Sequence, residues 1–132
     1  MKMAKFIAPM LAVILLAACA SAPPRAARSE FEDIPVPKGL DYQTSKSTII
    51  ESPTVKAARL VYRGRLEIGS LTVAMRTTLE ANGWRHVSST SSEHGTTQVY
   101  EKAGSSLEVR LWEGVWYTYV ELTAARSLQP AK

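Results

Sequence analysis

The sequence predicts an α+β domain of two layers, in which one amphipathic helix covers an antiparallel sheet of about four to six strands. One stretch, residues 70–83, repeats its apolar residues at helical spacing, whereas residues 57–67 and 107–122 alternate apolar and polar residues as half-buried strands do. Short polar stretches containing glycine separate these runs. The expected order of elements is β-α-β-β-β-β, with room for one further strand at the start.

The helix is predicted from an apolar residue at every fourth position: Leu71, Met75 and Leu79. Ser70 is the expected N-cap, because its hydroxyl can accept a hydrogen bond from a free first-turn N–H. Asn82 and Gly83 suit the C-terminus, with Gly83 in the left-handed region and the following residue folding back onto the last turn.

Before the helix, the sequence predicts an extended lead-in and two strands. Ile34–Pro37 cannot be helical, because each proline forces its predecessor into extended geometry. Residues 48–51 form a short predicted strand. Residues 57–67 form a longer one, with Gly64 marking a bulge or a close approach by the helix. Its two sides are an apolar set of Ala58, Leu60, Tyr62 and Leu66 and a largely basic set of Arg59, Val61, Arg63 and Arg65.

After the helix, residues 84–90 and 98–102 are predicted strands, joined by a polar loop over 91–97. The last hairpin is expected to turn at Glu113-Gly114, which would pair Leu111 with Trp116. One face would then hold Leu107, Val109, Leu111, Trp116, Val120 and Leu122. The other would hold Glu108, Arg110, Trp112, Tyr117, Tyr119 and Glu121. A three-residue turn with a bulge is the alternative.

The N-terminus has the features of a bacterial secretion signal. Two lysines precede an apolar stretch over residues 6–16, which is too short to span a bilayer. Residues 16–19, LAAC, resemble a lipobox, which implies a diacylglyceryl group on Cys19, cleavage before Cys19, and acylation such as palmitate on the new amino group. The alternative is an ordinary signal peptide followed by a free cysteine.

These features divide the chain into four expected parts. Residues 1–18 are the lipoprotein signal peptide, 19–32 a lipidated flexible tether, 33–126 a single α+β domain, and 127–132 a disordered tail. A flexible chain of the tether's length spans roughly 20 Å, so the domain should stay close to the membrane. Position 20 is alanine rather than aspartate. By resemblance to the sorting rule of Gram-negative lipoproteins, this implies the outer membrane, facing the periplasm.

Several motifs together resemble those of a family of small uncharacterised proteobacterial lipoproteins. They are the lipobox, the IPVP lead-in, LVYRGRLE, the run SL…LEANGW and the strand VYEK. A helix that ends in Gly-Trp and feeds an antiparallel meander is also similar to the helix-grip domains of envelope-assembly lipoproteins. Neither resemblance implies a known active site.

Composition and motifs give little sign of catalysis. The net charge is +4, but removal of the two N-terminal lysines leaves 14 basic against 12 acidic side chains, so nucleic acid is not an expected partner. No cofactor is expected, because there is no glycine-rich phosphate loop. His86 and His94 do not have metal-ligand spacing, and no serine lies in a nucleophile elbow. The expectation is that the protein is not an enzyme.

What remains is a candidate binding face on the sheet. Its expected residues are Arg59, Arg63, Arg65, Arg110, Trp112, Tyr117 and Tyr119. Trp, Tyr and Arg are enriched at interaction hot spots, although aromatic and charged residues also stabilise an ordinary solvent-facing sheet. The hypothesis is a non-catalytic module that docks on an envelope protein or on peptidoglycan. The alternative is a small periplasm-facing enzyme or a glycan-binding module.

Overall fold

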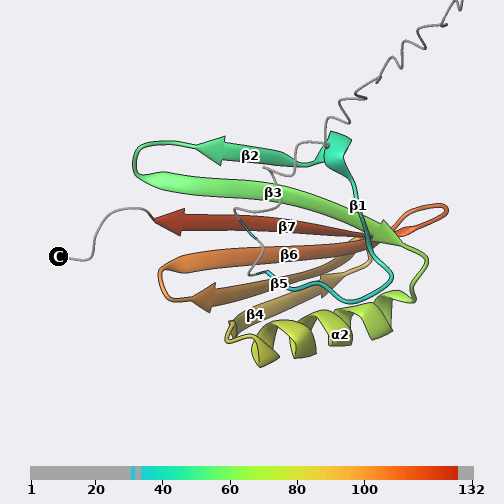
Figure 1. Ribbon diagram of the computed structural model, residues 1–132. Coiled ribbons are helices and arrows are strands. Elements are labelled where there is room, and N and C mark those ends of the chain that lie inside the picture. Colours follow the sequence, from blue (N-terminus) through green and yellow to red (C-terminus); the bar gives the residue numbers. More distant parts are fainter. Residues whose placement is uncertain (1–30, 32–33, 128–132) are drawn as a thin grey trace, which may run out of the picture.

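The structure is a computed structural model that describes residue 31 and residues 34–127 (Figure 1). Cys19, the predicted signal peptide and most of the predicted tether lie outside the described residues. So does the predicted tail over 127–132 apart from Ser127, which is the last residue of a strand and not disordered. In chain order the elements are β1 (Asp41–Tyr42), η1 (Thr44–Lys46), β2 (Thr48–Glu51), β3 (Val55–Gly64), α2 (Ile68–Ala81), β4 (Arg85–Ser92), β5 (Gly95–Lys102), β6 (Ser105–Glu113) and β7 (Thr118–Ser127).

The predicted α+β fold is confirmed. The strands form one antiparallel sheet of seven strands in the order β1-β3-β7-β6-β5-β4, and β2 pairs with β3 beside β1. The helix α2 lies against one face of this sheet (Figure 1). The last strand, β7, therefore occupies the middle of the sheet, between β3 and β6.

The core lies between the sheet and a cover made of the helix and the lead-in. Leu71, Met75 and Leu79 are the buried residues of α2, as their spacing predicts. Ile34 of the lead-in buries its side chain in the same cluster. Phe31 is buried there too, so the folded part of the chain includes a residue that the sequence assigns to the flexible tether. The sheet contributes alternate residues of its strands, namely Ala58, Leu60, Tyr62, Tyr100, Leu107, Val109, Leu111, Val120, Leu122 and Ala124.

The N-cap of the helix lies three residues earlier than predicted. Glu67, not Ser70, is the N-cap, and its carboxylate accepts hydrogen bonds from the N–H groups of Gly69 (2.8 Å) and Ser70 (2.6 Å). These bonds from Ser70 and Gly69 lower the pKa of Glu67, because they stabilise its charged form. A glutamate carboxylate can accept hydrogen bonds from the free N–H groups of a first helical turn, as a serine hydroxyl can. Glu67 is therefore the N-cap in place of Ser70.

The helix ends as predicted, at Gly83. Its φ is +86°, and its N–H donates to the carbonyl of Glu80 at 3.1 Å. The N–H of Trp84 donates to the carbonyl of Leu79 at 3.0 Å, which completes a Schellman motif. The buried indole of Trp84 then packs in the same core cluster as Leu79.

Two details of the loop predictions are wrong. The polar loop over residues 91–97 is mostly strand, because β4 and β5 continue to a two-residue turn at Glu93-His94. Serine and threonine can form a strand where both faces of the strand are exposed to water. Across this hairpin the hydroxyls of Ser91 and Thr96 lie 3.2 Å apart. At Gly64, the close approach comes from the backbone carbonyl of Gly39 in the lead-in, not from the helix.

The predicted turn at Glu113-Gly114 is also wrong. Residues 114–117 form a four-residue loop, and Leu111 pairs with Val120 instead of Trp116. Trp116 is consequently 77% exposed rather than buried. The shift is four residues, an even number, so the inward and outward sets of the two strands are otherwise unchanged. The observed register places Val120, Leu122 and Ala124 against the inner residues of β6.

This register predicts opposite outcomes for two truncations. Leu111→Ala should lower the free energy of unfolding by about 2–5 kcal/mol, because it leaves a cavity in the core. Trp116→Ala should change it by less than about 0.5 kcal/mol, as a surface substitution does. Urea unfolding of both variants measures the difference. A large loss of stability in Trp116→Ala would mean that the indole is buried after all.

Candidate functional site

The outer face of the sheet, opposite the helix, brings the two predicted stripes together. Arg59 and Arg63 of the predicted binding face lie on β3, Arg110 and Trp112 lie on β6, and Tyr119 lies on β7 between these two strands. On β7, Tyr119 pairs with Arg63 on one side and with Trp112 on the other. The stripes therefore form one continuous surface, which we call the docking face. It comprises Lys46, Arg59, Arg63, Arg65, Arg110, Trp112, Tyr117, Tyr119 and Glu121.

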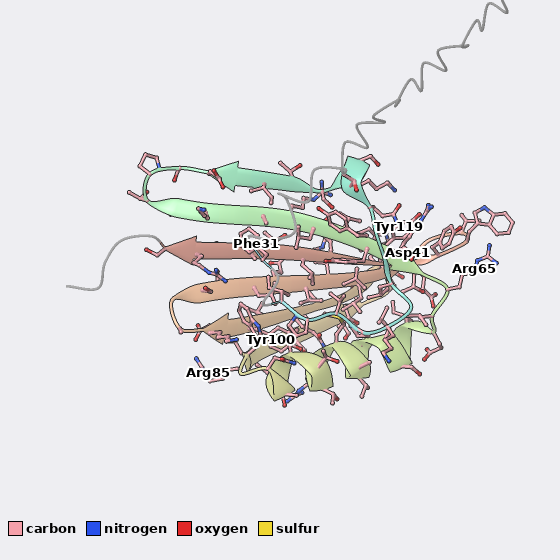
Figure 2. All side chains as sticks on the ribbon, in the orientation of Figure 1. Phe31, Asp41, Arg65, Arg85, Tyr100 and Tyr119 are labelled. Carbon is pink, nitrogen blue, oxygen red and sulfur yellow. The ribbon has the colours of Figure 1, made fainter. Side chains whose placement is uncertain are left out.

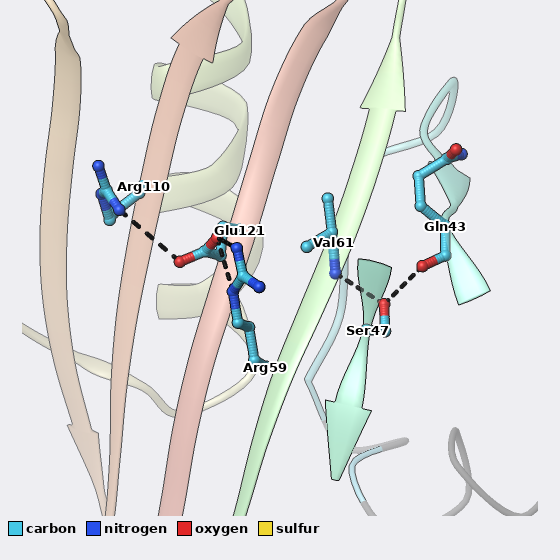
Figure 3. A network of polar contacts seen from close by, with 6 residues as sticks. All are labelled: Gln43, Ser47, Arg59, Val61, Arg110 and Glu121. Carbon is cyan, nitrogen blue, oxygen red and sulfur yellow. Dashed lines mark hydrogen bonds and ion pairs between the residues drawn. The ribbon is translucent and has the colours of Figure 1, made fainter. Parts of the chain in front are cut away.

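Glu121 is the centre of the docking face (Figure 3). Its side chain is only 8% exposed and accepts hydrogen bonds from Nε (2.9 Å) and Nη2 (2.7 Å) of Arg59. Nη1 of Arg110 approaches the other carboxylate oxygen at 3.8 Å from the opposite side. The hydrogen bond to Glu121 raises the pKa of Arg59, so this guanidinium stays charged. The carboxylate thus fixes two arginines at the middle of the face.

Sequence reasoning placed Glu121 on the outer face but did not include it in the site. Its partners come from β3 and β6, which are far apart in the sequence, and only the strand order shows that β7 separates them. The signal that could have found it is an acidic residue two positions from Tyr119, on the strand that alternation places on the basic and aromatic side of the sheet.

A stacked aromatic pair lies next to this ion cluster. The rings of Trp112 and Tyr119 have centroids 5.4 Å apart and planes only 12° from parallel. Lys46 lies 5.0 Å from the centroid of Tyr119, and the guanidinium carbon of Arg110 lies 5.8 Å from that of Trp112. Cations at such distances are attracted by the negative faces of the rings. The pair is therefore a rigid apolar platform with positive charge at its margins.

Tyr117 extends the docking face to the end of the sheet. It belongs to the β6–β7 loop rather than to a strand, and the guanidinium of Arg63 lies 4.4 Å from the centroid of its ring. Arg65, which follows β3, lies 5.5 Å from the same centroid. All seven residues predicted from the sequence thus lie on one connected surface, although Arg65 and Tyr117 lie at its edge.

A polar turn covers one side of this face, and sequence reasoning missed it. Residues 43–47, which include η1, lie between β1 and β2 and arch over β3, so that Val61 is only 2% exposed. The N–H of Val61 donates to the hydroxyl of Ser47 at 3.0 Å, and that hydroxyl donates to the carbonyl of Gln43 at 2.8 Å (Figure 3). The turn places Lys46 beside the aromatic pair.

Between this turn and the aromatic pair lies a shallow pocket of about 440 Å³. Its lining residues are Ser45, Lys46, Thr48, Arg59, Val61, Trp112 and Tyr119. Two cations, two hydroxyls and two aromatic rings form this lining. Such a lining can bind a carboxylate through its cations while the rings contact an adjacent apolar or planar group.

A second groove, of about 680 Å³, lies between the start of the helix and the turn that joins β4 to β5. Its titratable residues are Glu93, His94 and Glu113, all exposed. Glu93 and His94 are neighbours whose side chains approach to 3.6 Å at the surface. Within residues 34–127 no three metal-binding side chains gather, and the helix is not long and apolar enough to cross a membrane.

The other predicted histidine, His86, packs the edge of its ring against Tyr100 and shares a 2.7 Å hydrogen bond with the hydroxyl of Ser89. Tyr100 is fully buried, and this burial raises its pKa to about 12. Its hydroxyl donates to Oε1 of Gln98 at 2.9 Å, and Nε2 of Gln98 donates to the carbonyl of Thr72 at 3.3 Å. This polar chain links the sheet to the helix, and its bonds are made within the core.

Comparisons with known protein families, with curated proteins and with solved structures give no significant match. The resemblance to small proteobacterial lipoproteins, which depends on short motifs, therefore stays a prediction. The function has to be inferred from the docking face itself.

The ion cluster gives an asymmetric prediction. Arg59→Met should lower the urea midpoint clearly, because it removes both hydrogen bonds from a buried carboxylate. Arg110→Met should lower it less, since its 3.8 Å contact is no hydrogen bond. Both variants replace an arginine by methionine, and the two arginines lie on opposite sides of the Glu121 carboxylate. Equal midpoints for the two variants would mean that Glu121 does not depend on Arg59.

Proposed function

We propose that the protein is a lipid-anchored, non-catalytic docking module of the Gram-negative envelope, which binds a partner through its docking face. It is held at the outer membrane by acyl chains on Cys19 and faces the periplasm. The partner is an envelope protein, with peptidoglycan as the second candidate because both carry carboxylates. No cofactor is required.

One observation carries the docking proposal: three neighbouring strands concentrate arginine and aromatic side chains around a single buried carboxylate. Trp, Tyr and Arg are the residue types that contribute most to binding energy in protein interfaces. Here the ion cluster and the ring stack hold these side chains in place before any partner arrives. A preorganised surface loses less conformational entropy on binding, so more of the contact energy appears as affinity.

The charge distribution supports a partner with acidic groups. Lys46 and Arg59 line the pocket beside the aromatic pair, and Arg63 and Arg65 lie further along the face. Glu121 compensates part of this charge, and Glu108 is a further outward carboxylate on β6. Complementary charge mainly improves the rate and specificity of association, while the rings supply apolar contact area.

The anchor is argued from the sequence alone, where a charged start, an apolar stretch and LAAC precede the lone cysteine. Cys19→Ser should prevent incorporation of radioactive palmitate and leave the uncut precursor, because serine lacks the thiol that accepts the diacylglyceryl group. Gel electrophoresis with autoradiography reads both effects. Equal labelling of the variant and the native chain would remove the anchor from the proposal.

Docking is tested by a photo-crosslinking residue placed at Thr123, which lies outward on β7 beside Arg59. Irradiation of cells should give a defined adduct, and adding Trp112→Ala should reduce its yield at least several-fold while the protein stays folded. The matched control carries the crosslinker at Val73, an exposed residue of the helix on the opposite side of the molecule.

A protein adduct identifies the envelope partner, and a muropeptide adduct identifies peptidoglycan. Equal adducts from Thr123 and Val73, or no effect of Trp112→Ala, would contradict docking through this face. Since the readout needs no lipid on Cys19, the docking proposal and the anchor proposal are tested separately.

A further inference from the structure

The β6–β7 loop, residues 114–117, projects beyond the end of the sheet (Figure 1). It carries the two most exposed large apolar side chains among the described residues, Val115 at 89% and Trp116 at 77% exposure. Two such side chains next to each other form an apolar patch, and the main apolar patch of a soluble protein often marks an interaction site. The docking face does not use either side chain.

The loop is held in this position from several sides. The N–H of Gly114 donates to the carbonyl of Tyr117 at 2.7 Å, and a Cβ at Gly114 would lie 2.6 Å from the ring of Tyr119. At its base, the hydroxyl of Thr118 donates to the carbonyl of Leu66 at 2.6 Å. Tyr117 lies beneath the two arginines described above. The outward direction of the loop is therefore built into its contacts.

The chemistry of the loop fits the interfacial region of a bilayer. An indole has an apolar body and one N–H donor, and tryptophan is enriched where headgroups meet acyl chains. Arg63 and Arg65 lie at the base of the loop, where they can reach lipid phosphates; Figure 2 shows Arg65 at this end of the sheet. The carboxylates at this end of the sheet are Asp41, paired across strands with Arg63, Glu113, Glu67 at the N-cap of the helix, and Glu93 in the β4–β5 turn.

Because this end of the sheet is not predominantly basic, attraction to an acidic surface is not the main cause of contact. The free energy of contact comes from burying the apolar side chains of Val115 and Trp116, at about 25 cal/mol per Å². Two side chains are too small an area for a stable protein interface, which needs roughly 800 Å² on each partner. Contact with a membrane can be made by a smaller area if the chain is already anchored in that membrane. The anchor keeps the loop near the bilayer, so the second contact is intramolecular.

The chain between Cys19 and Phe31 is long enough for the anchor and the loop to reach one membrane. Phe31 lies at the other end of β7 from the loop, with the guanidinium of Arg126 at 5.7 Å from its ring centroid. Arg126 and Thr118 are eight residues apart on that strand, which is roughly 27 Å. The twelve steps from Cys19 to Phe31 can extend to roughly 40 Å. The anchor and the loop can therefore reach the same bilayer.

We propose that the β6–β7 loop is a second membrane contact, with Trp116 in the headgroup region of the bilayer that carries the anchor. This inference rests on the lipid anchor of the proposed function. The loop contact limits the rotation of the domain, which the tether alone would leave free.

The test uses the full chain purified with its native N-terminal modification and reconstituted in vesicles of phosphatidylethanolamine and phosphatidylglycerol. A fraction of the lipids carries bromine on the upper part of the acyl chains, where it quenches nearby tryptophan. The chain has three tryptophans, of which Trp84 is buried in the core and Trp112 lies on the docking face. Brominated lipid should quench the native chain and Trp112→Phe at least twofold more than Trp116→Phe.

The same samples separate the two proposals. Quenching that is equal in Trp116→Phe and the native chain, or absent in both, overturns the loop contact. A photo-crosslinker at Val115 should form lipid adducts, and a protein adduct in place of lipid also overturns it. Mass analysis of the peptide containing Cys19 reads the anchor: an unmodified Cys19 with retained quenching removes the anchor and leaves the loop contact.

Discussion

The pairing of β7 with two neighbours is the interaction on which the rest of the structure depends. Along β3 it joins ten residue pairs, from Val55 with Ser127 to Gly64 with Thr118, and along β6 it joins nine. Alternate residues of this one strand then have two different roles. Val120 and Leu122 fill the core beneath the helix, whereas Tyr119 and Glu121 organise the docking face. A change in its pairing would therefore affect stability and binding together.

The parts of the fold that depend on local pattern could be predicted from the sequence. The spacing of Leu71, Met75 and Leu79 indicates the helix and its buried side, and Gly83 marks its end. The position of the last turn could not be predicted, because a shift by an even number of residues keeps every strand residue on its side. Alternation alone thus predicted Trp116 in the core, although pairing over the full length of β7 leaves it in the loop.

The same reasoning applies to the candidate site. Five of its seven predicted residues are on strands, and they share a face because alternation determines which side each strand residue occupies. Glu121 and Lys46 could not be assigned in that way. The role of Glu121 depends on β7 lying between two strands that are distant in the sequence. The position of Lys46 depends on a five-residue arch, residues 43–47, that has no periodic pattern.

That arch has a further consequence where copies of the chain meet edge to edge. A continuous outer strand would present a row of free N–H and C=O groups, onto which the sheet of a neighbouring molecule could add. Here the edge beside β3 is broken into pieces of two and four residues. At the opposite edge, β4 has an irregular register between His86 and Ser88. Neither border offers a long straight template, so addition of a second sheet into a fibre is disfavoured at both edges.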